Sequence, residues 1–247
     1  MKLFLASLFL ALSFQGSVYA QAAPIDIVFD IDWTTFYSID TTSPNQIDNQ
    51  NIAIEGKTYR PTEHLGEVLQ ALSLHPEVRI SFFSGGEKSR NEALLKKLIL
   101  PNGRRAFDIA YRVLSKENLQ QVSEDSNLKF SQRYKKSFEG LLPGATPQRT
   151  ILIDDQVEFS KAPWKAVPSL GVFNYQKVFD NRQSAQQFYP STEQAWLNEK
   201  DKALMWKSLL EEAIVLSRKS DKPFSQITSD LWSAKSQNSL CKNVFIL

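Results

Sequence analysis

Short apolar runs alternate with amphipathic stretches along most of the chain, and the alternation predicts the fold. The apolar runs of strand length are residues 25–29, 78–83, 107–114, 150–153 and 170–173. The stretches with helical features are residues 61–72, 87–98 and 191–217. In the first, Leu65, Val68 and Leu72 share one helical face, and the second has acidic residues early and lysines late. Strands that alternate with helices predict a doubly wound, parallel α/β sheet.

The first twenty residues have the pattern of a secretory signal peptide rather than of a folded element. Lys2 precedes an apolar run over residues 3–14, and Val18-Tyr19-Ala20 forms a cleavage pattern before Gln21. A membrane anchor is the alternative, but a span needs about 20 apolar residues. We expect cleavage near Ala20, so residues 1–20 would be removed. The mature protein would then be periplasmic or secreted, without membrane contact.

Composition and charge exclude several classes of protein. With 42% hydrophobic and 23% charged residues, the 247-residue chain is globular rather than disordered. The 29 Lys and Arg nearly balance the 27 Asp and Glu without a basic stripe, which argues against a nucleic-acid partner. Cys241 is the single cysteine, and His64 and His75 are the two histidines. An intramolecular disulfide and a cysteine- or histidine-rich metal centre are therefore not expected. The oligomeric state stays open.

Polar residues follow three of the predicted strands at the point where each strand ends. These residues are Asp30 and Asp32 after the first strand, Ser84 after the second, and Asp154 and Asp155 after a later one. Ligands of parallel α/β sheets collect at the carboxyl ends of the strands, where these side chains would meet. Carboxylates that lie close together repel one another unless a cation is present, and an oxygen-rich site suits Mg²⁺.

Each of these signals has a structural alternative. A calcium-binding loop would need Asp or Asn at the position of Thr34 and Gly at the position of Thr35. The sequence therefore does not fit that alternative. Ser84 could instead cap the following helix, and Asp154-Asp155 could belong to a turn. Taken together, and each at a strand end, the signals favour a functional site.

The same residues resemble the motifs of the haloacid dehalogenase (HAD) superfamily. FDIDWT is similar to its first motif, DxDxT, FFSGG to its second, and ILIDD to its acidic fourth motif. The third motif is a lysine upstream of the fourth. Lys136 in RYKKSFEGL is our choice for it, with Lys135 as the near alternative. The resemblance covers residues 25–172 and implies a Rossmann-like sheet.

Two groups within the superfamily compete. YRPTEHLGEVLQAL and the strand after it are similar to the RNA polymerase II C-terminal-domain phosphatases, which carry a small flap instead of a cap domain. The stretch between Tyr37 and Tyr59 fits a β-hairpin flap and is too short for a helical cap. The export signal and the first motif are instead similar to bacterial periplasmic acid phosphatases. We expect the first architecture, with a catalytic domain over residues 21–190 and a helical extension over residues 191–247 packed on it.

The resemblance implies a phosphatase with an aspartyl-phosphate intermediate. Asp30 would be the nucleophile, and Asp32 would protonate the leaving oxygen and later activate water. The implied ligands of Mg²⁺ are Asp30, the Asp32 carbonyl, Asp154 and Asp155. The implied phosphate-binding residues are Ser84, Lys136 and Thr34, of which Thr34 would also hold the first loop in shape. Trp33 stands where the family often has a small or acidic residue, and it would narrow the entrance.

The substrate would be a phosphorylated small molecule or a phosphoprotein. Two alternatives stay open, a phosphotransferase and a non-catalytic binding or scaffold protein that keeps the fold. The presence of both Asp30 and Asp32 argues against the scaffold, because a protein without turnover does not need the acid.

Overall fold

The computed structural model describes residues 23–39, 50–169 and 200–238. Four of the sequence-based expectations lie outside this part of the chain, namely the signal peptide, the strand at 170–173, the beginning of the long helix expected over residues 191–217, and Cys241. Within the described residues, no helix is long and apolar enough to cross a bilayer.

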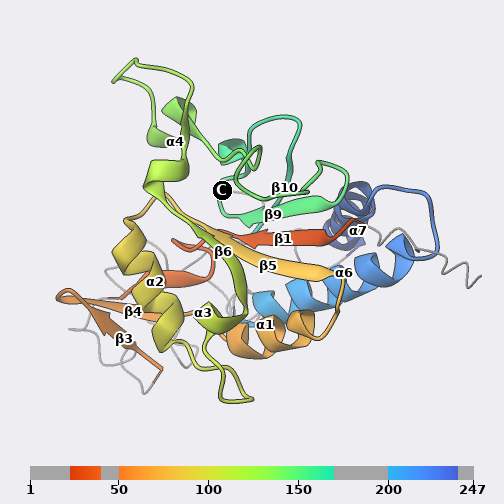
Figure 1. Cartoon of the computed structure of the whole chain (residues 1–247), viewed down its shortest axis with the longest axis horizontal. Coiled ribbons are helices and arrows are strands. Elements are labelled where there is room, and N and C mark those ends of the chain that lie inside the picture. Colours follow the sequence, from red (N-terminus) through yellow and green to blue (C-terminus); the bar gives the residue numbers. More distant parts are fainter. Residues whose placement is uncertain (1–22, 40–49, 170–199, 239–247) are drawn as a thin grey trace, which may run out of the picture.

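A five-stranded parallel sheet forms the centre of the molecule, with strand order β10-β9-β1-β5-β6 (Figure 1). Its strands are β1 (Ile25–Phe29), β5 (Val78–Phe83), β6 (Ala110–Leu114), β9 (Thr150–Asp154) and β10 (Lys165–Pro168). All four neighbouring pairs are parallel. The expected parallel α/β sheet is confirmed. The sequence did not predict β10, because Lys165 and Pro168 interrupt its apolar pattern, as an edge strand allows.

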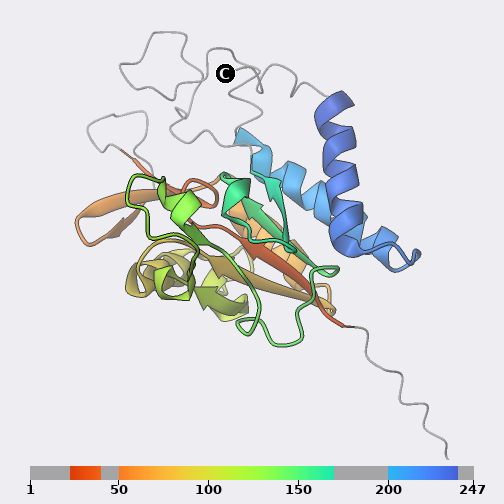
Figure 2. The same ribbon diagram turned by 90° about the horizontal axis from the view of Figure 1, so that it is seen from above.

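Helices cover one face of this sheet. They are α1 (Leu65–Ser73), α2 (Lys88–Lys97), α3 (Ala106–Ile109), α6 (Lys202–Ser217) and α7 (Phe224–Asn238). Ile25, Ile27 and Phe29 alternate along β1 and enter the core that these helices complete. The Phe29 ring lies 6.0 Å from that of Trp206 in α6, and Figure 2 shows α6 and α7 along one side of the sheet.

The opposite face is covered by the long connection between β6 and β9. Val28 points to this side and belongs to a second, smaller core with Phe83, Phe138 and Leu152. The connection contains the short helix α4 (Phe130–Arg133) and the two-stranded pair β7 (Gln120–Gln121) and β8 (Tyr134–Lys135). Figure 1 places α4 beyond the end of the sheet at which β1 finishes.

The segment expected to be a flap forms an antiparallel sheet with strand order β2-β4-β3. Its strands are β2 (Phe36–Ser38), β3 (Ile52–Ile54) and β4 (Lys57–Pro61). The β3–β4 hairpin turns through Glu55 and Gly56, whose φ angles are both positive, at 49° and 75°. A two-residue hairpin turn of this kind needs positive φ at both positions, which glycine adopts without strain.

Two element boundaries differ from the sequence-based expectation. Helix α1 begins at Leu65 rather than near Pro61, because Pro61 pairs with Phe36 as the last residue of β4. The run at 107–114 was expected to be one strand, but its first part is the helical turn α3. The Asp108 carboxylate accepts a hydrogen bond from the Arg105 N–H at 3.1 Å and caps that turn. Local periodicity over so few apolar residues does not separate a helical turn from a strand.

Candidate active site

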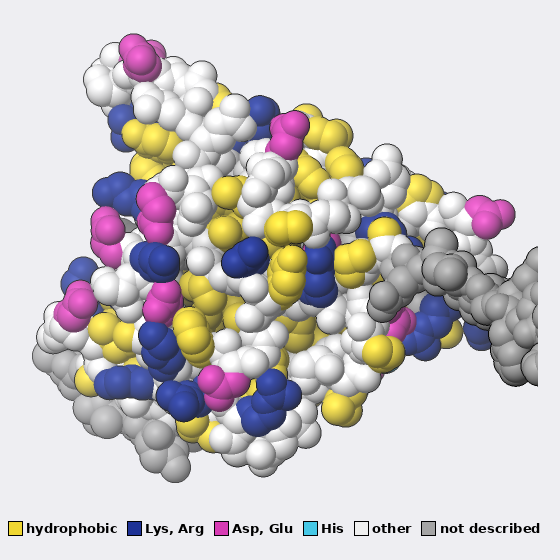
Figure 3. Space-filling view, in the orientation of Figure 1, with side chains coloured by type: hydrophobic (Ala, Val, Ile, Leu, Met, Phe, Trp, Pro, Cys, Tyr) yellow, Lys and Arg dark blue, Asp and Glu magenta, His cyan; other side chains and the backbone are white. Residues whose placement is uncertain are grey.

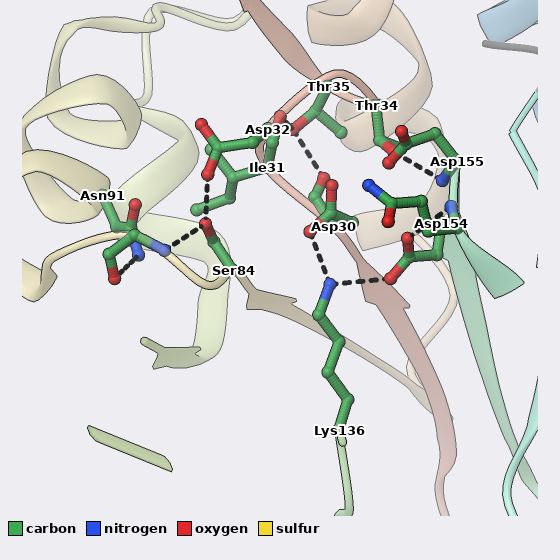
Figure 4. A network of polar contacts seen from close by, with 12 residues as sticks. Asp30, Ile31, Asp32, Thr34, Thr35, Ser84, Asn91, Lys136, Asp154 and Asp155 are labelled. Carbon is green, nitrogen blue, oxygen red and sulfur yellow. Dashed lines mark hydrogen bonds and ion pairs between the residues drawn. The ribbon is translucent and has the colours of Figure 1, made fainter. Parts of the chain in front are cut away.

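The register of the central strands brings the first and fourth motifs together. Phe29 of β1 pairs with Ile153 of β9, and the Asp30 N–H donates to the Ile153 carbonyl at 2.9 Å. The next residues, Asp30 and Asp154, therefore lie side by side on neighbouring strands, as Figure 4 shows. Both side chains are almost fully buried.

Lys136 bridges these two carboxylates. Its Nζ lies 2.5 Å from Asp30 Oδ1 and 2.7 Å from Asp154 Oδ2, and the side chain is 2% exposed. The Lys136 N–H donates to the Phe159 carbonyl at 2.7 Å, which fixes the backbone from which the side chain enters. Successive residues of an extended chain point to opposite sides. Lys135 accordingly points elsewhere and donates to the Glu158 carbonyl.

An acidic cluster lies beside the ammonium group. Carboxylate oxygens of Asp30, Asp154 and Asp155 all lie within 4.8 Å of one another. Burial raises the pKa of Asp30 well above its ordinary value. The charges of the neighbouring carboxylates raise this pKa further, whereas the charge of Lys136 lowers it. Burial and the Asp154 charge raise the pKa of Asp155 to about 6. The cluster could hold a divalent metal ion, because hard oxygen ligands that repel one another bind such a cation well.

Asp32 points away from this cluster, toward the end of β5. Ser84 Oγ donates to Asp32 Oδ2 at 2.5 Å and accepts a hydrogen bond from the Gly86 N–H at 2.9 Å. Arg90 of α2 donates to both Asp32 oxygens, with Nη2 at 2.6 Å from Oδ2. The pairing with Asp32 raises the pKa of Arg90 despite its burial. The Asp32 side chain is 36% exposed, so it borders the open part of the site.

The loop after β1 is held by its two threonines. Thr34 Oγ1 accepts a hydrogen bond from the Asp155 N–H at 3.0 Å and donates weakly to the Asp155 carboxylate at 3.4 Å. Thr35 Oγ1 donates to the Asp30 carbonyl at 2.8 Å. Thr34 is fully buried, so it ties the first motif to the fourth in this structure and is not exposed to a substrate. Trp33 has a φ angle of 63°, a strained value for a large side chain of the kind often found at functional sites.

A cavity of about 470 Å³ opens over these groups. Its floor contains Asp30, Asp32, Lys136, Asp154 and Asp155. Its walls come from the loop after β1, the flap, the beginning of α2, the connection between β6 and β9, and the turn after β9. They include Trp33, Lys57, Tyr59, Arg90, Phe130 and Phe159. On the face shown in Figure 3, Lys and Arg side chains are interspersed with Asp and Glu rather than gathered into a patch of one sign. The cationic side chains that line the cavity are Lys57, Arg90 and Lys136.

The structure brings together all seven residues that the sequence singled out. Ser84, Asp32, Asp30, Lys136, Asp154 and Asp155 lie in or beside the cavity, and Thr34 lies behind Asp155. Sequence reasoning missed Arg90, Lys57 and Tyr59. The only sequence signal for Arg90 was its place in the first turn of the helix that follows the Ser84 strand.

No protein-family model and no curated protein sequence matches the chain. Among solved structures, a variant of the fission yeast RNA polymerase II CTD phosphatase Fcp1 bound to beryllium fluoride matches with 14% identity and a TM-score of 0.41. The match covers 90% of this chain and 67% of that one, and a structure of Fcp1, described as an essential RNA polymerase II CTD phosphatase, gives the same values. The function of the chain is therefore inferred from the site itself.

Proposed function

We propose that the protein is an exported, Mg²⁺-dependent phosphatase that hydrolyses a phosphomonoester through an aspartyl-phosphate intermediate. The arrangement around Asp30 carries the proposal. One buried carboxylate lies 2.5 Å from a buried lysine, next to two further carboxylates, at the floor of an open cavity. A structural ion pair needs one acid for one base, whereas this arrangement has an acidic excess that suits a metal cation. The cation and Lys136 together would then attract a phosphate.

Asp30 attacks phosphorus, and the bond between phosphorus and the alcohol oxygen breaks. Asp32 protonates that oxygen, so the alcohol leaves neutral, and then takes a proton from water as the water attacks the aspartyl-phosphate. This second displacement breaks the bond to Asp30 and releases phosphate. Lys136 stabilises the charge on the phosphoryl oxygens, where fixed donors have their largest effect. Ser84 donates its hydroxyl hydrogen to Asp32 and so orients the acid-base carboxylate.

The donor set fits Mg²⁺. Asp30, Asp154 and Asp155 offer only oxygen ligands, and the Asp32 carbonyl would complete the set from the chain. Bound there, Mg²⁺ would shield the negative charge of the phosphate from the nucleophile. The carboxylate excess at the cluster and the raised pKa of Asp155 both support a cation at this position.

An assay of the mature protein against a panel of phosphomonoesters, with Mg²⁺ and with chelator, tests the proposed activity. We expect release of inorganic phosphate that depends on Mg²⁺. An acceptor alcohol added to the assay would yield a new phosphoester if the protein were a phosphotransferase. If the protein hydrolysed none of the phosphomonoesters in the panel, a non-catalytic scaffold protein would be favoured instead.

Magnesium should stabilise the protein in a pH-dependent way. Without metal, the pKa of Asp155 is about 6 in the folded state and 3.8 in a free side chain. The folded state therefore holds the Asp155 proton more tightly than the unfolded state does. As a result, the contribution of Asp155 to the free energy of unfolding falls by about 2–3 kcal/mol as the pH rises through about 4–7. Mg²⁺ binds the ionised cluster, so the gain in melting temperature at saturation should grow over that range to about 5–10 °C.

Differential scanning fluorimetry at several pH values, with Mg²⁺ or chelator, measures this effect. Asp155→Asn should reduce the response, whereas Asp221→Asn, at an exposed aspartate, should keep it. A Mg²⁺ response that is absent, or that is the same in Asp155→Asn, would contradict the assigned metal site.

Export is the second part of the proposal. The protein purified from its native host should begin at or near Gln21 and should be found outside the cytoplasm, because signal peptidase cleaves after the Val18-Tyr19-Ala20 pattern. Intact-mass measurement of cell fractions decides this. Retention of residues 1–20 in the membrane fraction would instead indicate an anchor.

A further inference from the structure

Arg90 donates hydrogen bonds to both carboxylate oxygens of Asp32, the proposed acid-base group. Its Nη2 lies 2.6 Å from Asp32 Oδ2, its Nη1 donates to Oδ1, and Ser84 also donates to Oδ2. To act on a leaving oxygen, the Asp32 carboxyl has to turn toward that oxygen. The Arg90 guanidinium then needs another anionic acceptor, because a charge that is 14% exposed is costly to leave unpaired.

Arg90 lies where the alcohol part of a substrate would be. The reacting phosphate would lie against Asp30 and Lys136, so the alcohol extends to the side of Asp32. On that side the main cavity adjoins a smaller one of about 250 Å³. The two cavities share the lining residues Asp32, Trp33, Lys57, Tyr59 and Arg90. An alcohol part that enters here meets two cationic side chains and two aromatic rings.

The guanidinium is held in place by its neighbours. Asn91 Oδ1 accepts a hydrogen bond from Arg90 Nη2 at 2.7 Å, and Asn91 is itself fixed by a 2.9 Å hydrogen bond from Nδ2 to Ser115. Gly86 leaves the space that the guanidinium fills, because a Cβ at this position would lie 1.6 Å from Arg90 Nη2. Arg90 is therefore a preorganised donor fork and not a mobile surface charge.

We propose that Arg90 recognises a second anionic group, a carboxylate or a phosphate, on the alcohol part of a small phosphomonoester. The planar fork of arginine matches either group through two hydrogen bonds. This inference rests on the proposed phosphatase function and specifies its substrate class. Binding of the second anion would also free the Asp32 carboxylate to turn toward the leaving oxygen, because the anion replaces Asp32 as the partner of Arg90.

The test compares two substrates with the same carbon skeleton, glycerol 3-phosphate and 3-phosphoglycerate, which differ only in having a hydroxymethyl or a carboxylate group. p-Nitrophenyl phosphate serves as the baseline substrate. Wild-type protein should favour 3-phosphoglycerate over glycerol 3-phosphate by about 10-fold or more in kcat/KM. Arg90→Gln should reduce this ratio by at least about 10-fold, mainly through KM, because the lost contact binds the substrate rather than the reacting atoms.

Three further variants sharpen the test. Gly86→Ala puts a methyl group where the guanidinium lies, so it should displace Arg90 without replacing it. This variant should therefore also lower the preference in kcat/KM for 3-phosphoglycerate. Arg90→Lys keeps the charge but not the fork and should give an intermediate ratio. Lys116→Gln removes a cation that pairs with Glu87 at the cavity rim, and the ratio should stay at the wild-type value.

The outcomes separate the two proposals. If wild-type protein hydrolyses p-nitrophenyl phosphate but does not favour 3-phosphoglycerate, the role of Arg90 is wrong and the phosphatase stands. An equal loss on all substrates in Arg90→Gln would also overturn it, because Arg90 would then only position Asp32 or bind the reacting phosphate. If wild-type protein hydrolyses none of the three substrates, the phosphatase proposal fails and the Arg90 proposal fails with it.

Discussion

Asp30→Asn should abolish hydrolysis, with a loss of about 10⁴-fold or more, because the amide cannot attack phosphorus and no covalent intermediate forms. The variant should still fold. Asparagine has the same shape, and Lys136 keeps Asp154 as its ion-pair partner. In the metal-free protein the substitution also removes a buried charge, because burial, with a smaller contribution from the neighbouring carboxylates, raises the pKa of Asp30. We therefore expect an unchanged or higher melting temperature without metal. Steady-state hydrolysis and scanning fluorimetry on the same sample measure both effects.

Asp32→Asn is the matched variant of Asp30→Asn, two residues along the same loop. It keeps the proposed nucleophile and removes the proposed acid-base group, which should lower the rate by about 10²–10⁴-fold. The loss should shrink for aryl phosphates, whose leaving groups need little protonation. Rapid quenching followed by mass spectrometry should detect a phosphate adduct on the Asp30 peptide of this variant. Equal activity of wild type and Asp30→Asn would exclude the aspartyl-phosphate mechanism.

Lys136→Met should lose both activity and stability. Its ammonium group is the cation that bonds both Asp30 and Asp154, and all three side chains are buried. Removal of one partner from a buried ion pair costs about 3–5 kcal/mol, and the loss of one charge-stabilising donor costs about 10²–10³ in rate. Without this cation, the pKa of Asp30 rises further. The loss of stability should therefore be smaller at low pH, and Mg²⁺ should recover part of it at neutral pH.

The neighbouring lysine supplies the control. Lys135 donates to the Glu158 carbonyl, so Lys135→Met should change the free energy of unfolding by about 0.5 kcal/mol or less and leave hydrolysis at the wild-type rate. Urea unfolding and kinetics of the two variants side by side provide the comparison. If Lys135→Met were the inactive variant, the assignment of the third motif to Lys136 would be wrong.

The sequence by itself determined the central strands and the groups at their ends. The apolar runs that became β1, β5 and β9 are local patterns, and the polar residue that follows each run is fixed by the chain. Parallel strands have their carboxyl ends at one edge, so Asp30, Ser84 and Asp154 had to meet once the sheet formed. Helices α1 and α2 were predicted for the same reason, since helical periodicity and charge order are local.

Only the tertiary structure decided which lysine serves the site. Lys135 and Lys136 are adjacent and identical, and their difference comes from the pairing of the backbone with Phe159 and Lys161, which directs one side chain inward. The same holds for Arg90, because its partner Asp32 is distant in sequence and belongs to another strand end. The helical turn α3 and the edge strand β10 also depended on long-range packing rather than on local pattern. Contacts between distant segments leave no periodic pattern in the sequence. Local patterns were therefore enough to identify the acidic residues of the site, whereas only the folded structure shows which cations pair with them.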